Sequence, residues 1–147
     1  MTDPDAPTSP APATPRHHVL TAVALGGALG TLARAGLAEA QGHDPSTWPW
    51  GTLAANLVGT FLLGWWTLRL THRPDLDPRF RPFLTTGVCG GLTTFSTLQL
   101  ELVRQLDDGR WALAGAYGAV TLAGGLLTAV AGHRAARAWH RRGTGVA

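Results

Sequence analysis

The chain has 147 residues, of which 45% are hydrophobic and 14% are charged, with a formal net charge of +3. A soluble domain has roughly a quarter of its residues charged, so this low charged fraction indicates a protein that lies in a lipid membrane. Nucleic-acid binding is not predicted, because the arginines flank apolar segments and form no single patch. The single cysteine, Cys89, excludes an internal disulfide and has no partner at metal-site spacing.

Four apolar segments lie between two tails of different composition. The first tail, residues 1–16, is rich in Pro, Ala, Ser and Thr and is predicted to be disordered, because it has little apolar surface to bury. The last tail, residues 135–147, is basic. Each apolar segment has roughly the 20 residues that a helix needs to cross a hydrocarbon core. The predicted spans, within a domain of residues 17–134, cover about 19–37, 50–70, 83–103 and 111–132.

Short loops join these spans, so the sequence predicts an all-α integral membrane protein built as a small bundle of four transmembrane helices. Glycines recur through the spans. Small residues let helices approach closely in lipid, where packing drives their association. Trp48 and Trp50 are expected to anchor the start of the second span at a membrane interface.

The first span has a second interpretation, as a secretory signal peptide. Arg16, the apolar run after it and the small residues 38–40 match the pattern of such a peptide and its cleavage site. Arg34 argues against this interpretation, because it would lie next to the cleavage site. Cleavage would also leave three spans without the first helix as a packing partner.

Polar side chains occur inside the predicted spans, where they are costly and usually face a cavity or another helix. Thr52 and Asn56 are four residues apart and therefore share one face of the second helix. The amide of Asn56 can donate to a passing anion or form a hydrogen bond between helices, and both interpretations are open. The other candidates are Arg34, Thr93, Thr94, Ser96, Thr97, Glu101, Tyr117 and Thr121.

The third span contains the stretch CGGLTTFSTLQLE, from Cys89 to Glu101. Its glycines and hydroxyl side chains weaken a helix, because they lower helix propensity and compete for backbone hydrogen bonds. A helix broken at bilayer depth frees carbonyl oxygens, which must be buried, hydrated or bound to an ion. We predict a break at the centre of this helix, with a simple kink or close helix crossing as the alternative. Phe95 lies within the polar cluster, and the edge of its ring can meet a small anion.

Three motifs, in their order and spacing, resemble the Fluc (CrcB) fluoride channel family. They are GGALGTLAR (Gly26 to Arg34), WGTLAANLVGTFLLG (Trp50 to Gly64) and the highly specific GVCGGLTTFSTLQLE (Gly87 to Glu101). The resemblance covers about residues 19–132. It implies a passive channel that exports toxic fluoride from the cytoplasm and gives fluoride resistance. It also implies an antiparallel two-subunit assembly with two pores and a structural sodium ion at the centre of the interface.

By motif position, the resemblance implies that the backbone carbonyls of Gly90 and Thr93 bind this sodium ion. It makes Asn56 the pore asparagine and Phe95 the first pore phenylalanine. Leu98 stands where the family has a second pore phenylalanine, so one anion contact is lost, because an aliphatic side chain has no quadrupole. The other implied pathway positions are Thr52, Thr97, Tyr117 and Thr121 along a polar track, Glu101 near a pore mouth and Arg34 near the vestibule.

The arginines are distributed unevenly between the two sides of the predicted bundle. Lysine is absent, and nine arginines lie on the side of the two termini, whereas only Arg104 and Arg110 lie opposite. By the positive-inside rule, both termini of this multi-pass plasma membrane protein are predicted to be cytoplasmic. An antiparallel homodimer needs the chain to insert both ways, so we hypothesise an oppositely oriented paralogue whose phenylalanine complements Leu98. A homodimer that tolerates leucine is the alternative.

Two other classes of membrane protein fit the sequence less well than a channel. A small multidrug transporter also has four short spans, but it should carry a carboxylate inside its first span, and Glu39 lies beyond the end of that span. A non-conducting assembly subunit would not account for Asn56, Phe95 and the weakened third helix together. An enzyme is not predicted, because no nucleophile, base and orienting group share a site.

Overall fold

The computed structural model describes residues 16–41, 48–71, 73 and 75–143. All regular structure in these ranges is helical, as the sequence predicts. The elements are α1 (Arg16–Gln41), α2 (Trp50–Thr71), α3 (Phe80–Pro82), the π-helical η1 (Phe83–Cys89), α4 (Gly90–Leu92), α5 (Ser96–Asp107) and α6 (Trp111–Gly143). The junctions of α3, η1 and α4 keep helical dihedral angles, so residues 80–92 form one continuous rod.

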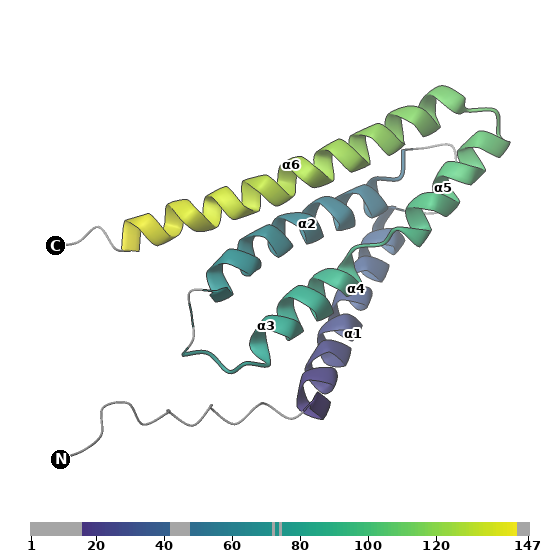
Figure 1. Cartoon of the computed structure of the whole chain (residues 1–147). Coiled ribbons are helices and arrows are strands. Elements are labelled where there is room, and N and C mark those ends of the chain that lie inside the picture. The colour runs from purple at the N-terminus through teal and green to yellow at the C-terminus, as the bar shows by residue number, and fades with distance from the viewer. Residues whose placement is uncertain (1–15, 42–47, 72, 74, 144–147) are drawn as a thin grey trace, which may run out of the picture.

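The bundle consists of two packed sets of helices (Figure 1). In one set α2 packs along α6, and in the other α1 packs against η1 and α4. α2 also contacts α1 and η1 and so joins the two sets. α5, which follows the rod, packs against α6. The chain from the rod to α5 therefore contacts one set with its first half and the other set with its second half.

Within the described residues, α1 and α6 are the two helices that are long and apolar enough to cross a membrane by length and composition. In their most apolar windows only 11% and 17% of the residues are buried inside the chain. Large side chains such as Leu25, Leu29 and Leu126 are exposed. The core helix of a soluble protein would bury such residues, so these apolar faces fit contact with lipid or with another chain.

The helix boundaries agree with the predicted spans more closely inside the bundle than at its ends. α2 covers the second predicted span, and the rod and α5 together cover the third. α1 begins at Arg16, which composition had assigned to the tail, and α6 continues past the predicted end of the fourth span to Gly143. The residues at these ends, mainly Arg, His and Ala, are compatible with a helix. The helix therefore continues beyond the apolar segment from which its end was predicted. Residues 1–15 and 144–147, where the outer parts of the predicted tails fall, lie outside the described residues.

Four glycines bring α1 into backbone contact with the rod. A Cβ atom on Gly87 would lie 2.9 Å from the Cα atom of Gly26, and one on Gly30 would collide with the carbonyl oxygen of Val88. A Cβ on Gly91 would collide with the carbonyl oxygen of Gly27. No side chain fits between the two backbones at these points, which is how small residues pack helices in lipid. We call this contact the glycine seam; it consists of Gly26, Gly30, Gly87 and Gly91.

Three residues separate the rod from α5. α4 ends at Leu92, and Thr93 is extended, with φ −75° and ψ 151°. Thr94 and Phe95 are also outside any helix, and α5 begins at Ser96. The direction of the chain therefore changes at 93–95, between the two sets of helices.

Candidate ion pathway

Three helices each contribute two polar residues that are four positions apart. This spacing places both members of a pair on one helix face, one turn from each other. The hydrogen bonds of Glu101 join the faces of α2, α5 and α6, and we call this set of residues the polar seam. Its residues are Thr52, Asn56, Thr97, Glu101, Tyr117 and Thr121.

Glu101 lies at the centre of the best-connected part of this seam. The hydroxyl of Thr52 donates to its Oε1 atom over 2.6 Å, and the hydroxyl of Tyr117 donates to its Oε2 atom over 2.7 Å. Tyr117 is fully buried and Thr52 is 7% exposed. Each carboxylate oxygen is thus bound by a hydroxyl from a different helix. Such short bonds to a carboxylate are among the stronger hydrogen bonds in proteins.

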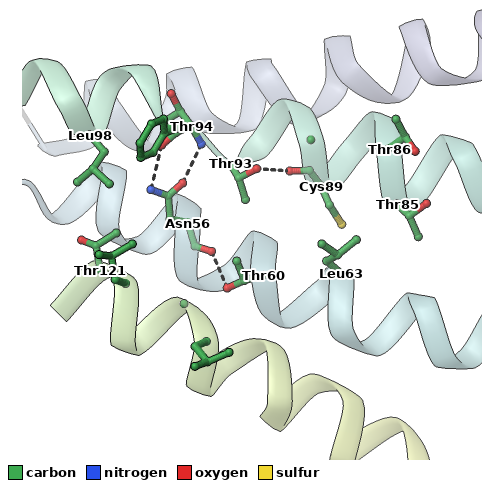
Figure 2. Close-up of a pocket in the computed structure, with 15 residues that line it drawn as sticks. Asn56, Thr60, Leu63, Thr85, Thr86, Cys89, Thr93, Thr94, Leu98 and Thr121 are labelled. Atoms are coloured by element: carbon green, nitrogen blue, oxygen red, sulfur yellow. Dashed lines mark hydrogen bonds between the residues drawn. The ribbon is translucent and has the colours of Figure 1, made fainter. Parts of the chain in front are cut away.

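Asn56 binds the backbone of the segment between α4 and α5 (Figure 2). Its Nδ2 atom donates to the carbonyl of Thr94 over 3.1 Å, and the amide of Thr94 donates to its Oδ1 atom over 2.8 Å. The bond thus joins a helix to a non-helical segment, whereas the sequence left open a bond between helices and donation to an anion. A primary amide carries a second N–H proton, however, and this proton remains available to an anion.

The same segment releases two backbone carbonyls from helical bonding. In a continuous helix, the amides of Thr94 and Thr97 would donate to the carbonyls of Gly90 and Thr93. Here the amide of Thr94 donates to Asn56, and the amide of Thr97 donates to the hydroxyl of Thr94 over 3.2 Å. No atom lies within 4 Å of the side-chain position of Gly90. The two carbonyls implied as sodium ligands are therefore among those that have lost their helical donors.

A groove of about 540 Å³ runs between α2, α6 and the chain from η1 to α5 (Figure 2). Asn56, Thr93 and Thr121 contribute polar groups to its lining. Phe95 borders the groove and is 67% exposed, whereas Leu98 borders it and is 4% exposed. Leu98 forms the apolar core of this region with Leu53 and Tyr117. The groove thus has polar groups along a mainly apolar wall.

The predicted site residues do not all gather at this groove, because its lining does not include Thr52, Thr97, Glu101, Tyr117 and Arg34. Arg34 lies on α1, where its Nε atom donates to the carbonyl of Gly91 over 3.2 Å. It therefore contacts the glycine seam, on the opposite side of the rod. The polar seam also continues beyond the predicted residues, since the hydroxyls of Thr60 and Thr128 are 2.8 Å apart. Thr60 is four residues after Asn56, and this helical spacing could have placed it on the same face from the sequence alone.

Gln105 and Trp48 were also not predicted as site residues from the sequence, although they are neighbours of Glu101 and Thr52. Gln105, four residues after Glu101, is 3% exposed. Trp48, four residues before Thr52, was expected only as an interfacial anchor; its ring packs edge-on against Tyr117, with 5.6 Å between the ring centroids. Trp50 is 64% exposed, as expected of an anchor. The direction of each indole depends on the tertiary neighbours and not on the local sequence.

Comparison with known proteins identifies the family. The family model described as "CrcB-like protein, Camphor Resistance (CrcB)" matches residues 21–133. The chain belongs to the CrcB family. The match begins inside α1, so most of the first helix is part of the matched domain.

Similar proteins carry consistent names. "Fluoride-specific ion channel FluC 1" of Mycobacterium tuberculosis is 52% identical over 108 residues, which cover 74% of this chain and 82% of the relative. "Fluoride-specific ion channel FluC 2" of Geobacillus kaustophilus is 42% identical over 132 residues, which cover 86% of this chain and 99% of the relative. "Fluoride-specific ion channel FluC" of Pectobacterium carotovorum is 43% identical over 108 residues, 74% of this chain and 85% of the relative.

Proposed function

We propose that this CrcB protein is a passive, fluoride-selective channel that exports fluoride from the cytoplasm and gives fluoride resistance. Its relatives are named fluoride-specific ion channels, and their similarity covers most of the chain. The observation that connects this function to the chain is the polar seam, of which Asn56 and Thr121 line the groove. A channel needs no reaction chemistry, in agreement with the expectation that the protein is not an enzyme.

Fluoride is small and strongly hydrated, so a selective pathway must replace its water with well-placed hydrogen-bond donors. The second N–H proton of Asn56 and the hydroxyl of Thr121 are such donors at the groove. The Thr121 hydroxyl is buried and has no hydrogen-bond partner among the described residues. Phe95 adds the weakly positive edge of an exposed ring. Chloride is larger and a weaker acceptor, so it gains less from the same donors.

Glu101 is the one acid in the polar seam, and its charge opposes an anion. Both of its oxygens accept hydroxyl hydrogen bonds, from Thr52 and Tyr117. We propose that this pairing holds the carboxylate in place and away from the groove, whose lining does not include Glu101. On the other side of the rod, the positive charge of Arg34 attracts anions and raises their local concentration, which opposes the repulsion by Glu101.

We further propose that the rod and α5 are two halves of a single transmembrane span, broken at 93–95. A sodium ion at the break would be held by the carbonyls of Gly90 and Thr93, with a second chain supplying an equivalent pair. Support comes from the loss of helical donors to both carbonyls. Backbone oxygens suit a cation of this kind. When bound, the ion supplies fixed positive charge that ties the two subunits together.

The assembly we propose is an antiparallel pair of subunits in the plasma membrane. The groove is bordered by exposed apolar side chains, namely Phe95, Leu122 and Leu126, which a second subunit would cover. The arginine bias favours one orientation with cytoplasmic termini. We therefore keep both assemblies as proposals: a homodimer, and a pair with an oppositely oriented paralogue whose phenylalanine complements Leu98.

Fluoride efflux from liposomes that contain only the purified protein tests this function, with a fluoride electrode and chloride as the control anion. Asn56→Asp replaces the amide donor by a carboxylate, and Phe95→Ala removes the ring; both should abolish efflux. Phe80→Ala is the control for Phe95→Ala, because Phe80 is exposed and does not border the groove.

Three results are distinguishable. Fluoride efflux from the single protein, lost in the two variants, supports a self-sufficient homodimer. Efflux that appears only after an oppositely biased paralogue is added supports the heteromeric pair. Efflux of chloride at the same rate as fluoride, or no fluoride efflux under either condition, contradicts the proposed function.

A further inference from the structure

Among the described residues, three buried side-chain atoms have no hydrogen-bond partner within the chain. They are Nε1 of Trp48, Oε1 of Gln105 and Oγ1 of Thr121. Such atoms are rare in native proteins, where water or a ligand usually satisfies them. Thr121 already borders the groove. The proposed pathway gives Trp48 and Gln105 no role so far, although both lie next to the polar seam.

The hydrogen bonds of the seam show where these two residues lie. Thr52 bonds Glu101, whereas Asn56, one turn later on α2, bonds Thr94, which precedes α5. Residue numbers thus rise along α2 as they fall along the facing chain, so the two run antiparallel. Four residues before Thr52 is Trp48, and four residues after Glu101 is Gln105. Trp48 and Gln105 therefore lie on the side of the Glu101 hydrogen bonds that is nearer the end of the bundle.

Independent contacts agree with this position. The Trp48 ring packs against the cluster that includes Tyr117, which donates to Glu101. Gln105 is 3% exposed, and the end of α5 lies where α6 begins (Figure 1). The start of α2 lies at the same end of the bundle. Trp48 and Gln105 thus stand between the Glu101 hydrogen bonds and the outside of the bundle.

The two unpartnered atoms have complementary chemistry. An indole N–H is only a donor, and an amide oxygen is only an acceptor. Fluoride can accept from the indole but cannot donate to the amide, whereas a water molecule bound to fluoride has a second proton to donate. One fluoride ion with one water of its hydration shell satisfies both atoms at once.

We propose that Trp48 and Gln105 form an access site for partly hydrated fluoride at one end of the polar seam. The indole N–H of Trp48 donates to the ion, and the accompanying water donates to Oε1 of Gln105. The ion then moves inward, past Tyr117 and Thr52, toward Asn56. This inference rests on the proposed function, because it assigns a first binding step to the same pathway.

Fluoride efflux from liposomes, measured over a range of fluoride concentrations on the full chain, tests the access site. Trp48→Phe keeps an aromatic ring but removes the N–H donor, and Gln105→Met keeps a linear side chain but removes the amide. Trp50→Phe and Gln99→Met make the same changes at exposed neighbours and serve as matched controls. Thermal unfolding of every variant is measured alongside efflux.

Each site variant should raise the fluoride concentration for half-maximal efflux by roughly three- to tenfold, as expected for one lost hydrogen bond, while its control changes it little. The double variant Trp48→Phe with Gln105→Met should raise this concentration by less than the product of the two single effects, because both residues hold the same hydrated ion. If one site variant fails to fold, the other decides the matter.

Three results would overturn the access site. The first is a concentration dependence in the site variants that matches the controls. The second is a lower melting temperature with an unchanged concentration dependence, which would mean that the two atoms hold only a structural water. The third is a double variant whose effects multiply, which would mean that the residues act separately. Wild-type protein without fluoride efflux would instead contradict the proposed function, whatever the variants do.

Discussion

The glycine seam and the polar seam involve successive parts of the chain, the rod and α5, and are built in opposite ways. In the glycine seam, Gly26 and Gly87 bring two backbones together with no side chain between them. In the polar seam, side chains from three helices meet, and hydroxyls bind both oxygens of Glu101. The first gives close packing in lipid, where hydrophobic burial contributes little. The second places Asn56 and Thr121 on the lining of a groove.

The interruption at 93–95 lies where the chain passes from one seam to the other. Before it, the rod contributes Gly87 and Gly91 to the glycine seam. After it, α5 contributes Thr97 and Glu101 to the polar seam. A straight helix would keep the same faces toward the same neighbours. The non-helical residues 93–95 thus separate a segment that makes a packing contact from one that makes a polar contact, so changes in the two seams should have different consequences.

The largest expected effect is on folding, from Gly30→Ala in the glycine seam. The added methyl group would meet the backbone of Val88 and Leu92, and backbone moves less readily than a side chain. We expect a loss of about 1–3 kcal/mol in the free energy of unfolding, seen as a lower melting temperature in detergent. Gly36→Ala, on the same helix and in open space, is the control, because it carries the same gain in helix propensity. Equal melting temperatures for the two variants would refute the close contact.

The second effect is on conduction, from Thr52→Val in the polar seam. Valine keeps the shape of threonine but removes the donor to Glu101. We expect fluoride efflux to fall by about tenfold, the equivalent of one lost hydrogen bond, with a smaller change in melting temperature than Gly30→Ala causes. Thr67→Val is the matched control, because the exposed Thr67 hydroxyl bonds only the carbonyl of Leu63 on its own helix. If both variants conduct alike, the seam is not the pathway.

Arg34 tests whether a residue that contacts the glycine seam also acts on the ion. Its guanidinium donates to the carbonyl of Gly91. Arg34→Gln removes the charge, and we expect efflux to fall by about two- to fivefold at low ionic strength and by less at high ionic strength, because salt screens the attraction of anions. Arg34→Lys retains the charge and should conduct nearly normally. A lower melting temperature with unchanged efflux would assign Arg34 to packing alone.

The smallest effect is expected outside both seams, at the loop between α2 and α3. Arg79 makes a bidentate ion pair with Asp77, which lowers the pKa of that carboxyl from 3.8 to about 2. Because the pKa is lower in the folded protein, the pair stabilises the fold above about pH 4 and loses this contribution as the pH falls toward 2. Both side chains are about half exposed, so the contribution is small.

Asp77→Asn should therefore leave fluoride efflux and the melting temperature at pH 7 nearly unchanged. It should also remove part of the pH dependence of melting between pH 4 and 2, measured in the same detergent. A large loss of efflux in this variant would show that the loop is coupled to the pathway, which nothing in its contacts suggests.

Local pattern was sufficient to predict much of this molecule. Apolar runs located α1, α2 and α6, because hydropathy depends on each segment alone. The spacing of four between Thr52 and Asn56 placed them on one face, since helical periodicity is local too. The glycines and hydroxyls after Cys89 marked the region where α4 ends and α5 begins. Family resemblance, and not pattern, supplied the ion and the sodium ligands.

Other features depend on residues far apart in the chain. The binding of Glu101 by Thr52 and Tyr117 joins three helices, and no local pattern specifies which hydroxyl reaches which oxygen. The same holds for Trp48, which packs on Tyr117 while the neighbouring Trp50 is exposed. The buried state of Gln105 likewise followed only from the packing of α5 on α6.

The sequence by itself determined that this is a helical membrane chain, roughly where its helices lie and which polar residues stand on shared faces. These properties follow from hydropathy and helical periodicity, which act over a few turns. Only the tertiary structure decided that the rod packs through glycines while α5 joins a polar seam, and that Asn56 binds the backbone of Thr94. The reason is physical: a hydrogen bond or a backbone contact between helices needs both partners at a set distance, and that distance is fixed only when the whole bundle packs.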